Sequence, residues 1–284
     1  MTPKYIMIAS SKGGVGKSTA ALGIARAFRD LGKRVLVSDL DFGNASLDML
    51  FGVQDSVVGT IQDVCLGRCS VEKVLIDIGG EGKRPLFRRK RRHKVEQAGA
   101  MWLLPSSAGG GDCTPGTVGE LSLDSGDICN AILDAAKHVN ADHVIIDTGA
   151  GVNSPAAAAA AVADTALVVA GQMPVSLRSA QTTAERLASY GVSDIRLVVN
   201  SFDPRGVILE DRKGLLGVID EARAPLAGVI PYDYALMLTH EGIYADKGDA
   251  DMAFYNIAER LLGESIPLFY GIKKLRRLKN KICL

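Results

Sequence analysis

Short apolar runs rich in β-branched residues recur along the chain, and polar segments with helical spacing separate most of them. The runs lie at residues 5–9, 34–38, 101–104, 143–146, 166–170, 195–200 and 226–230. Apolar residues recur every three or four positions at 20–31, 128–139, 176–190 and 211–221, which places them on one face of a helix. This alternation predicts an α/β fold: a doubly wound, mostly parallel sheet with helices on both faces.

Two basic stretches interrupt this pattern. Residues 79–100 are polar and contain eight of the 33 basic residues, so we expect an exposed insertion loop within one domain that spans 1–265. A separate segment, 266–284, contains six more basic residues. Without these 14 side chains, 19 basic residues remain against 32 acidic ones. The domain is therefore acidic, and its positive charge is gathered in two short stretches.

The cysteines and the apolar segments indicate a compartment. The five cysteines include no C-x-x-C pair, and the first residues contain no signal peptide. The most apolar region, residues 155–173, is rich in alanine and is interrupted by Asp164 and Gln172, so it is too short for a membrane span. We expect a cytoplasmic protein without a transmembrane helix.

The residues after the first predicted strand carry the strongest chemical signal. They read Lys12-Gly13-Gly14-Val15-Gly16-Lys17-Ser18-Thr19 and lead into a predicted helix, which is the context of a phosphate-binding P-loop. Glycines let the backbone approach phosphate oxygens and point N–H groups at them. We expect Lys17 to reach the β- and γ-phosphates and Ser18 to ligate Mg²⁺, with the helix N-terminus adding its positive end. The general pattern has glycine where this chain has Ser11, and a second lysine, Lys12, follows it.

Carboxylates follow two other predicted strands. Asp39 and Asp41 are separated by one residue as the chain leaves the second strand, so their side chains point the same way. Asp147 ends the apolar run 143–146 and precedes Gly149-Ala150-Gly151. Mg²⁺ prefers hard oxygen ligands, and ligands of such sheets bind at the carboxyl ends of the strands. We therefore expect Ser18, Asp39 and Asp147 to surround a metal ion there.

These motifs resemble those of the MinD/ParA family of deviant Walker A P-loop ATPases. The resemblance implies ATP and Mg²⁺ as cofactors and a homodimer in the ATP state, in which Lys12 reaches the nucleotide of the other subunit. It implies that Asp41 orients the attacking water, that Asp39 belongs to the magnesium shell, and that the backbone of Gly151 senses the γ-phosphate.

The resemblance also places a base-binding region further along the chain. Asn200 ends a predicted strand where the family has its adenine-recognising asparagine, and an amide can donate to and accept from the adenine edge. Pro231 and Asp233 belong to a segment similar to the family's Ile-Pro-x-Asp element beside the base.

Residues 272–284 form a basic amphipathic segment. Ile272, Leu275, Leu278 and Ile282 follow one another at spacings of 3, 3 and 4, and the opposite face is basic. Such a helix can lie in a membrane interface, where each Lys or Arg near anionic lipid contributes roughly 1 kcal/mol. A dimer would present two of them. Packing on the acidic domain, disorder and nucleic-acid binding are the alternatives.

The resemblance, with this tail, favours a switch of the MinD branch. ATP would drive dimerisation, the dimer would bind the inner face of the cell membrane, and hydrolysis would release it, so that the division site is positioned. The slow catalysis of such switches implies a protein activator of the MinE type, and nucleic acid is not expected as a partner. The basic insertion would suit anionic lipid or nucleic acid equally, or it is a solvated loop.

Three alternatives use the same fold. Gly149-Ala150-Gly151 agrees with FlhG-type regulators of flagellar number, but an N-terminal extension of that type is not seen. A ParA-type DNA partition ATPase needs a basic face, whereas this domain is acidic. An iron–sulfur carrier of the Mrp type needs paired cysteines, and Cys65 and Cys69 have the wrong spacing.

Overall fold

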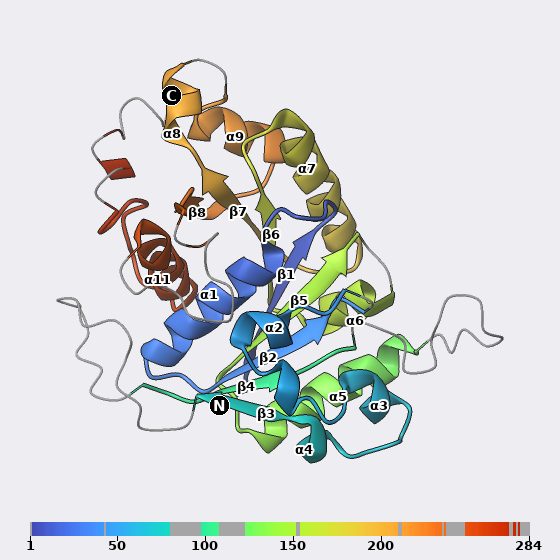
Figure 1. The fold of residues 1–284 in the computed structure, drawn as a ribbon. Coiled ribbons are helices and arrows are strands. Elements are labelled where there is room, and N and C mark those ends of the chain that lie inside the picture. The colour runs from blue at the N-terminus through green and yellow to red at the C-terminus, as the bar shows by residue number, and fades with distance from the viewer. Residues whose placement is uncertain are drawn as a thin grey trace.

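The computed structural model describes residues 2–42, 44–79, 98–107, 123–151, 154–209, 212–234, 236, 248–272, 275, 276 and 278. Within them, an eight-stranded sheet has the strand order β3-β4-β2-β5-β1-β6-β7-β8 (Figure 1). All neighbouring strands are parallel except β3 and β4, which are antiparallel. The predicted doubly wound, mostly parallel sheet is confirmed.

The central strands are buried on both faces, as is usual for parallel strands covered by helices. Every residue of β2 is buried, and so are the last five of β1. The strands are β1 (Lys4–Ser10), β2 (Val35–Leu40), β3 (Ile76–Gly79), β4 (Met101–Leu104), β5 (His143–Ala150), β6 (Thr165–Ala170), β7 (Asp194–Phe202) and β8 (Leu226–Pro231).

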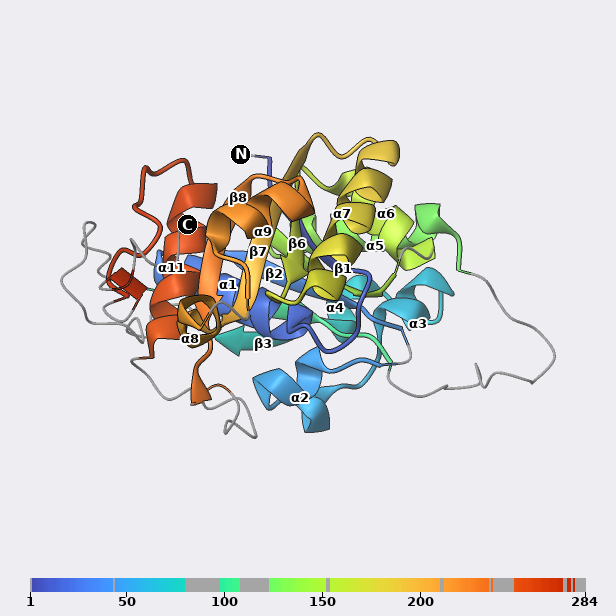
Figure 2. The same ribbon diagram turned by 90° about the horizontal axis from the view of Figure 1, so that it is seen from above.

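Helices cover both faces of the sheet (Figures 1 and 2). α1 and α11 pack together on one face, and α5, α6, α7 and α9 line the other, as right-handed crossovers require. The helices are α1 (Lys17–Asp30), α2 (Leu47–Phe51), α3 (Ile61–Cys65), α4 (Val71–Val74), α5 (Ser125–His138), α6 (Ser154–Val162), α7 (Pro174–Ser189), α8 (Pro204–Ile208), α9 (Leu215–Ala222) and α11 (Asp249–Leu261), with a 3₁₀ turn at Gln54–Ser56.

Two regions differ from the expected element boundaries. The helix expected at 211–221 begins at Leu215, where Gly214 is its N-cap. The edge strand β3 was not predicted, because its four residues are too few to show a period. The basic insertion falls between β3 and β4, and residues 80–97, which hold its charge, lie outside the described residues.

The chain beyond α11 packs back onto the domain. Arg260 of α11 donates to the carbonyl oxygens of Ile266 at 3.0 Å and Pro267 at 2.9 Å. Of the expected membrane-facing stripe, Ile272 and Leu275 are buried in the core. The body of the protein thus covers these apolar side chains in this structure. No helix among the described residues is both long and apolar enough to cross a bilayer.

Candidate functional site

The P-loop joins the end of β1 to the start of α1. Gly16 is the N-cap of α1 and adopts a left-handed conformation with φ of 89°, and Gly14 has φ of 72°. A Cβ atom at Gly16 would fall on the side chain of Asn200, whereas nothing lies within 4 Å of a Cβ at Gly13 or Gly14. The loop is therefore fixed at its helix end and open where phosphate oxygens need to approach the backbone.

Two lysines of this loop have different surroundings. Lys17 begins α1 and is buried, whereas Lys12 is exposed at the start of the loop. The first turn of α1 contains no acidic side chain that would compete for its N–H groups. The positive end of α1 and Lys17 thus form an anion site, and Lys12 lies at its rim.

Asp39 and Asp147 occupy opposing register positions on the neighbouring strands β2 and β5, and both are almost fully buried. The Asp39 carboxylate accepts hydrogen bonds from the N–H of Asp41 at 2.9 Å and of Ser46 at 3.3 Å. Burial raises the pKa of Asp39 to about 6, although these bonds oppose the rise.

Asp147 has no such support. Neither of its carboxylate oxygens has a hydrogen bond of normal geometry among the described residues. Burial raises its pKa to about 8, and the charge of Asp39 adds to the rise, while the nearby Ser18 hydroxyl and Lys17 oppose it. A buried carboxylate without a partner is costly, so the site is incomplete without a cation.

The residues around Asp147 fit a magnesium ion. The described residues contain no group of three or more His, Cys, Asp or Glu side chains that could hold a metal alone. A Mg²⁺ ion in a nucleotide site takes one or two carboxylates and completes its shell with phosphate oxygens and water. Asp147, Asp39 and the Ser18 hydroxyl match that ligand set.

Asp41 lies against the end of β5. A Cβ atom at Gly149 would come within 2.9 Å of Asp41 Oδ1, so only glycine leaves room for this carboxylate. The N–H of Gly151, expected to sense the γ-phosphate, donates to the Ser10 carbonyl at 3.0 Å. Such a contact with phosphate therefore requires this bond to open.

The predicted base-binding residues separate into two groups. Asn200 Nδ2 donates to the Val15 carbonyl of the P-loop at 2.7 Å, so the amide lies at the phosphate end of the site and keeps Oδ1 as an acceptor. Pro231 ends β8 beside Phe202 of β7. Asp233 instead accepts from the N–H of Ala250 at 3.4 Å, at the start of α11. Asp233 therefore accepts a hydrogen bond from the first turn of α11 in this structure.

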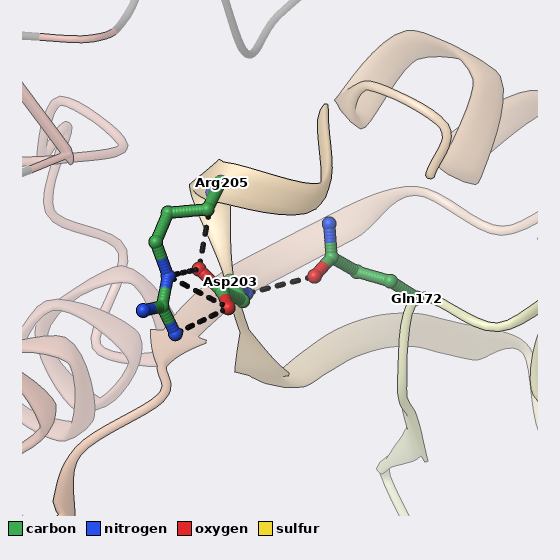
Figure 3. A network of polar contacts seen from close by, with 3 residues as sticks. All are labelled: Gln172, Asp203 and Arg205. Carbon is green, nitrogen blue, oxygen red and sulfur yellow. Dashed lines mark hydrogen bonds and ion pairs between the residues drawn. The ribbon is translucent and has the colours of Figure 1, made fainter. Parts of the chain in front are cut away.

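A polar network at the carboxyl ends of β6 and β7 was not predicted. Figure 3 shows the Gln172 side chain accepting from the Asp203 N–H at 2.8 Å, while the Arg205 guanidinium donates to the Asp203 carboxylate at 2.8 and 3.0 Å. Arg205 holds the pKa of Asp203 below its usual range. Gln172 had been noted only as a break in an apolar run. Its position two residues after β6, at the carboxyl edge of the sheet, was the available signal.

The chain is similar to known nucleotide-binding proteins over most of its length. Residues 6–241 match the family described as the CobQ/CobB/MinD/ParA nucleotide binding domain. The septum site-determining protein MinD of Synechocystis is 28% identical over 284 residues, which cover 98% of this chain and 97% of that protein. MinD of Bacillus subtilis is 28% identical over 268 residues, covering 93% and 90%.

Solved structures agree with this similarity. The MinC:MinD cell division protein complex of Aquifex aeolicus contains a chain that is 29% identical with a TM-score of 0.75, covering 93% of this chain and 98% of that one. The septum site-determining protein MinD of Pyrococcus horikoshii, complexed with Mg-ADP, has the same fold at 24% identity and a TM-score of 0.71, covering 92% and 96%.

Proposed function

This chain belongs to the CobQ/CobB/MinD/ParA nucleotide-binding family, and from that membership we propose that it works as an ATP-driven switch of the MinD type. It is a P-loop ATPase, and ATP and Mg²⁺ are its cofactors. The observation that carries the proposal is the buried Asp147 carboxylate, which has no hydrogen-bond partner in the described part of the chain and lies beside an open P-loop with an exposed Lys12. The proposed septum role is supported by MinD relatives that this chain matches along nearly its whole length.

Each residue around the P-loop has a task in this function. The backbone of residues 13–19 and the Lys17 ammonium would bind the phosphates, and Ser18, Asp39 and Asp147 would hold the magnesium ion. When bound, Mg²⁺ neutralises the charge that develops on the phosphates. Asp41, whose carboxylate lies against the end of β5, orients the attacking water.

The ATP-bound form is a homodimer that meets at the carboxyl edge of the sheet. Lys12 is exposed at that edge and reaches the nucleotide of the other subunit. Large apolar side chains exposed after β2, β6 and β7 support an interface there: Met49, Met173, Val175 and Leu209 are 55–76% exposed. Such side chains become buried when a second copy covers the edge.

The dimer binds the inner membrane surface through residues 272–284. Because Ile272 and Leu275 are buried against the body, insertion into lipid requires the segment to detach. Burial of each such side chain stabilises the docked state by about 1.5–3 kcal/mol, and acyl chains offer a similar gain. The apolar side chains therefore gain about as much against the body as in lipid. The basic residues, at roughly 1 kcal/mol each near anionic lipid, then shift the equilibrium toward the membrane. Arg276, exposed while Leu275 is buried, already points away from the body.

One protein partner completes the proposed cycle. A protein activator of the MinE type accelerates hydrolysis, because P-loop switches hydrolyse slowly until a partner completes the site. Release of the dimer then returns the protein to the cytoplasm, so that it alternates between the cytoplasm and the membrane periphery.

Vesicle sedimentation tests this function. We expect the protein to sediment with anionic vesicles in ATP and to detach in ADP. Because deletion of 272–284 removes core side chains, the sharper variant replaces Arg276, Arg277 and Lys279 by Glu. It should lose vesicle binding while its affinity for ATP is unchanged.

A matched variant controls for total charge. Lys73, Lys137 and Arg223 are exposed on other parts of the surface, and their replacement by Glu should leave vesicle binding within about twofold of the wild type. Equal vesicle binding in ATP and ADP, or binding to DNA alone, would contradict the membrane switch.

A regulator of flagellar number of the FlhG type is the second candidate. The Gly149-Ala150-Gly151 sequence at the end of β5 favours it. Deletion of the gene separates the two: misplaced septa and small cells without a nucleoid support the division role, and altered flagellar number with normal septa supports the second.

A further inference from the structure

Ser11 stands where the general P-loop pattern has glycine, and its hydroxyl contacts α7. Ser11 Oγ donates to the carbonyl oxygen of Ser179 at 3.0 Å and also forms a hydrogen bond with the Ser179 hydroxyl. One turn further along α7, Thr183 Oγ1 donates toward Ser11 Oγ and the Ser179 carbonyl, both at 2.9 Å. These three side chains form a hydroxyl cluster between the P-loop and α7.

The cluster has a preferred arrangement because Thr183 is buried. Only 1% of its surface is exposed, so water cannot replace a lost partner of its hydroxyl group. The Thr183 hydroxyl has one partner within its own helix, the Ser179 carbonyl, and one outside the helix, Ser11 Oγ. Ser11 therefore fixes the start of the P-loop against α7, although 168 residues separate Ser11 from Ser179.

Two further hydrogen bonds extend this attachment to Lys12. Ser10 Oγ donates to the Lys12 carbonyl at 2.9 Å and accepts from the Lys12 N–H at 3.1 Å. The backbone of Lys12 is thus held on one side by Ser10 and follows directly after the residue that contacts α7. Gly13 and Gly14, which follow Lys12, are open: no atom of the described residues lies within 4 Å of a Cβ atom built at either position.

The opposite end of the loop has its own attachment. Asn200 of β7 donates to the Val15 carbonyl at 2.7 Å. The phosphate-binding half of the loop is therefore held by β7 and α1, while the half that carries Lys12 is held by α7. Loss of one attachment should leave the other in place.

We propose that Ser11, Ser179 and Thr183 are positioning residues that set the pose of Lys12 and so couple the lysine-dependent step to α7. The proposal rests on the proposed function, because that function gives Lys12 its role at the nucleotide of the second subunit. A shift of α7 would move Ser11, and through it Lys12, without displacing the half of the loop that binds phosphates.

Thr183→Val tests the cluster, since it keeps the shape of the side chain and removes the hydroxyl. Its matched control is Thr182→Val on the same helix, where an exposed hydroxyl donates to the Arg178 carbonyl at 3.2 Å. We expect Thr183→Val to lower kcat for ATP at least about fivefold while KM and the affinity for ADP stay within about twofold. Thr182→Val should match the wild type, and Thr183→Ser should restore kcat.

A second readout does not depend on catalysis. Hydrogen–deuterium exchange of a peptide covering residues 8–16, measured with ADP bound, should be faster in Thr183→Val than in Thr182→Val. If the wild type neither dimerises nor hydrolyses ATP, the proposed function fails. The exchange measurement still shows whether the hydroxyl cluster holds the start of the P-loop. Ser11→Ala removes the same contact from the loop side and replaces Thr183→Val if that variant does not fold.

Two results would overturn the proposal. One is equal kcat and equal exchange in Thr183→Val and Thr182→Val. The other is a loss of ADP affinity as large as the loss of kcat, which would mean that the cluster supports the whole loop and not Lys12 in particular.

Discussion

Asp39 and Asp147 lie at opposing register positions on β2 and β5, yet among the residues that the structure describes only Asp39 receives hydrogen bonds from backbone N–H groups. Two neighbouring buried carboxylates repel each other, and the one without a partner bears most of the penalty. This asymmetry indicates that the fold is built around a cation that it does not itself supply.

Asp147→Asn should stabilise the nucleotide-free protein at alkaline pH. The folded-state pKa of Asp147, about 8, is above its unfolded value, so the folded protein keeps a proton that the unfolded chain releases, and stability falls as the pH rises toward 8. Between pH 6 and pH 8 this loss is roughly 3 kcal/mol, at about 1.4 kcal/mol per pH unit, and Asn avoids it because it cannot ionise. Urea unfolding at pH 6 and pH 9 measures this: the wild type should lose more stability between them. ATP hydrolysis should be lost in the variant, and a less stable variant at pH 9 would refute this account of Asp147.

Gly149→Ala should impair hydrolysis more than binding. The new Cβ atom would lie 2.9 Å from Asp41 Oδ1 and push this carboxylate from its position. We expect kcat to fall about tenfold or more, with ADP affinity within about threefold of the wild type. Gly126→Ala is the control, since its Cβ meets nothing closer than 3.7 Å. Unchanged turnover in Gly149→Ala would exclude the assigned role of Asp41.

Asn200→Leu should weaken nucleotide binding. It removes the bond to the Val15 carbonyl, which holds the loop, and the Oδ1 acceptor, which is predicted to contact adenine. We expect ATP affinity to fall about tenfold, which corresponds to roughly 1.4 kcal/mol, and the preference for ATP over GTP to narrow. Titration with fluorescent analogues of both nucleotides measures it. A uniform loss for both would assign Asn200 to the loop alone.

His143 should make the fold sensitive to mild acid. Its ring stacks on Phe28 with centroids 4.3 Å apart, and burial lowers its pKa to about 4, with nearby Lys33 adding to the effect. Because the unfolded chain binds the proton more readily, stability should fall as the pH drops from about 6.5 through 4, by on the order of 1–2 kcal/mol. In His143→Gln, urea midpoints at pH 7 and pH 5 should differ less than in the wild type. An equal difference would contradict this assignment.

The sequence predicted the parts of the structure that local patterns determine. Strands β1, β2 and β5 are buried on both faces and therefore appear as continuous apolar runs. The P-loop and Asp41 follow such strands, and Asp39 and Asp147 lie toward the carboxyl ends of β2 and β5, so their meeting at one edge could be expected from topology.

Contacts between distant segments could not be predicted. The apolar stripe of Ile272 and Leu275 was visible in the sequence, but periodicity does not say whether lipid or the protein's own core covers it. The contact of Ser11 with α7 and the turn of Asp233 toward α11 likewise depend on tertiary packing. Strand β3 has four residues and an antiparallel partner, and neither feature leaves a clear signal.

The central claim is that ATP drives a dimer through Lys12. Sedimentation velocity of the wild type and of Lys12→Ala, each with ATP and with ADP, tests it most directly. We predict a dimer only for the wild type in ATP, together with ADP affinity in Lys12→Ala that is within about threefold of the wild type, because Lys17 and α1 bind the phosphates. A Lys12→Ala protein that dimerises normally in ATP, or a wild type that stays monomeric in ATP, would contradict the account.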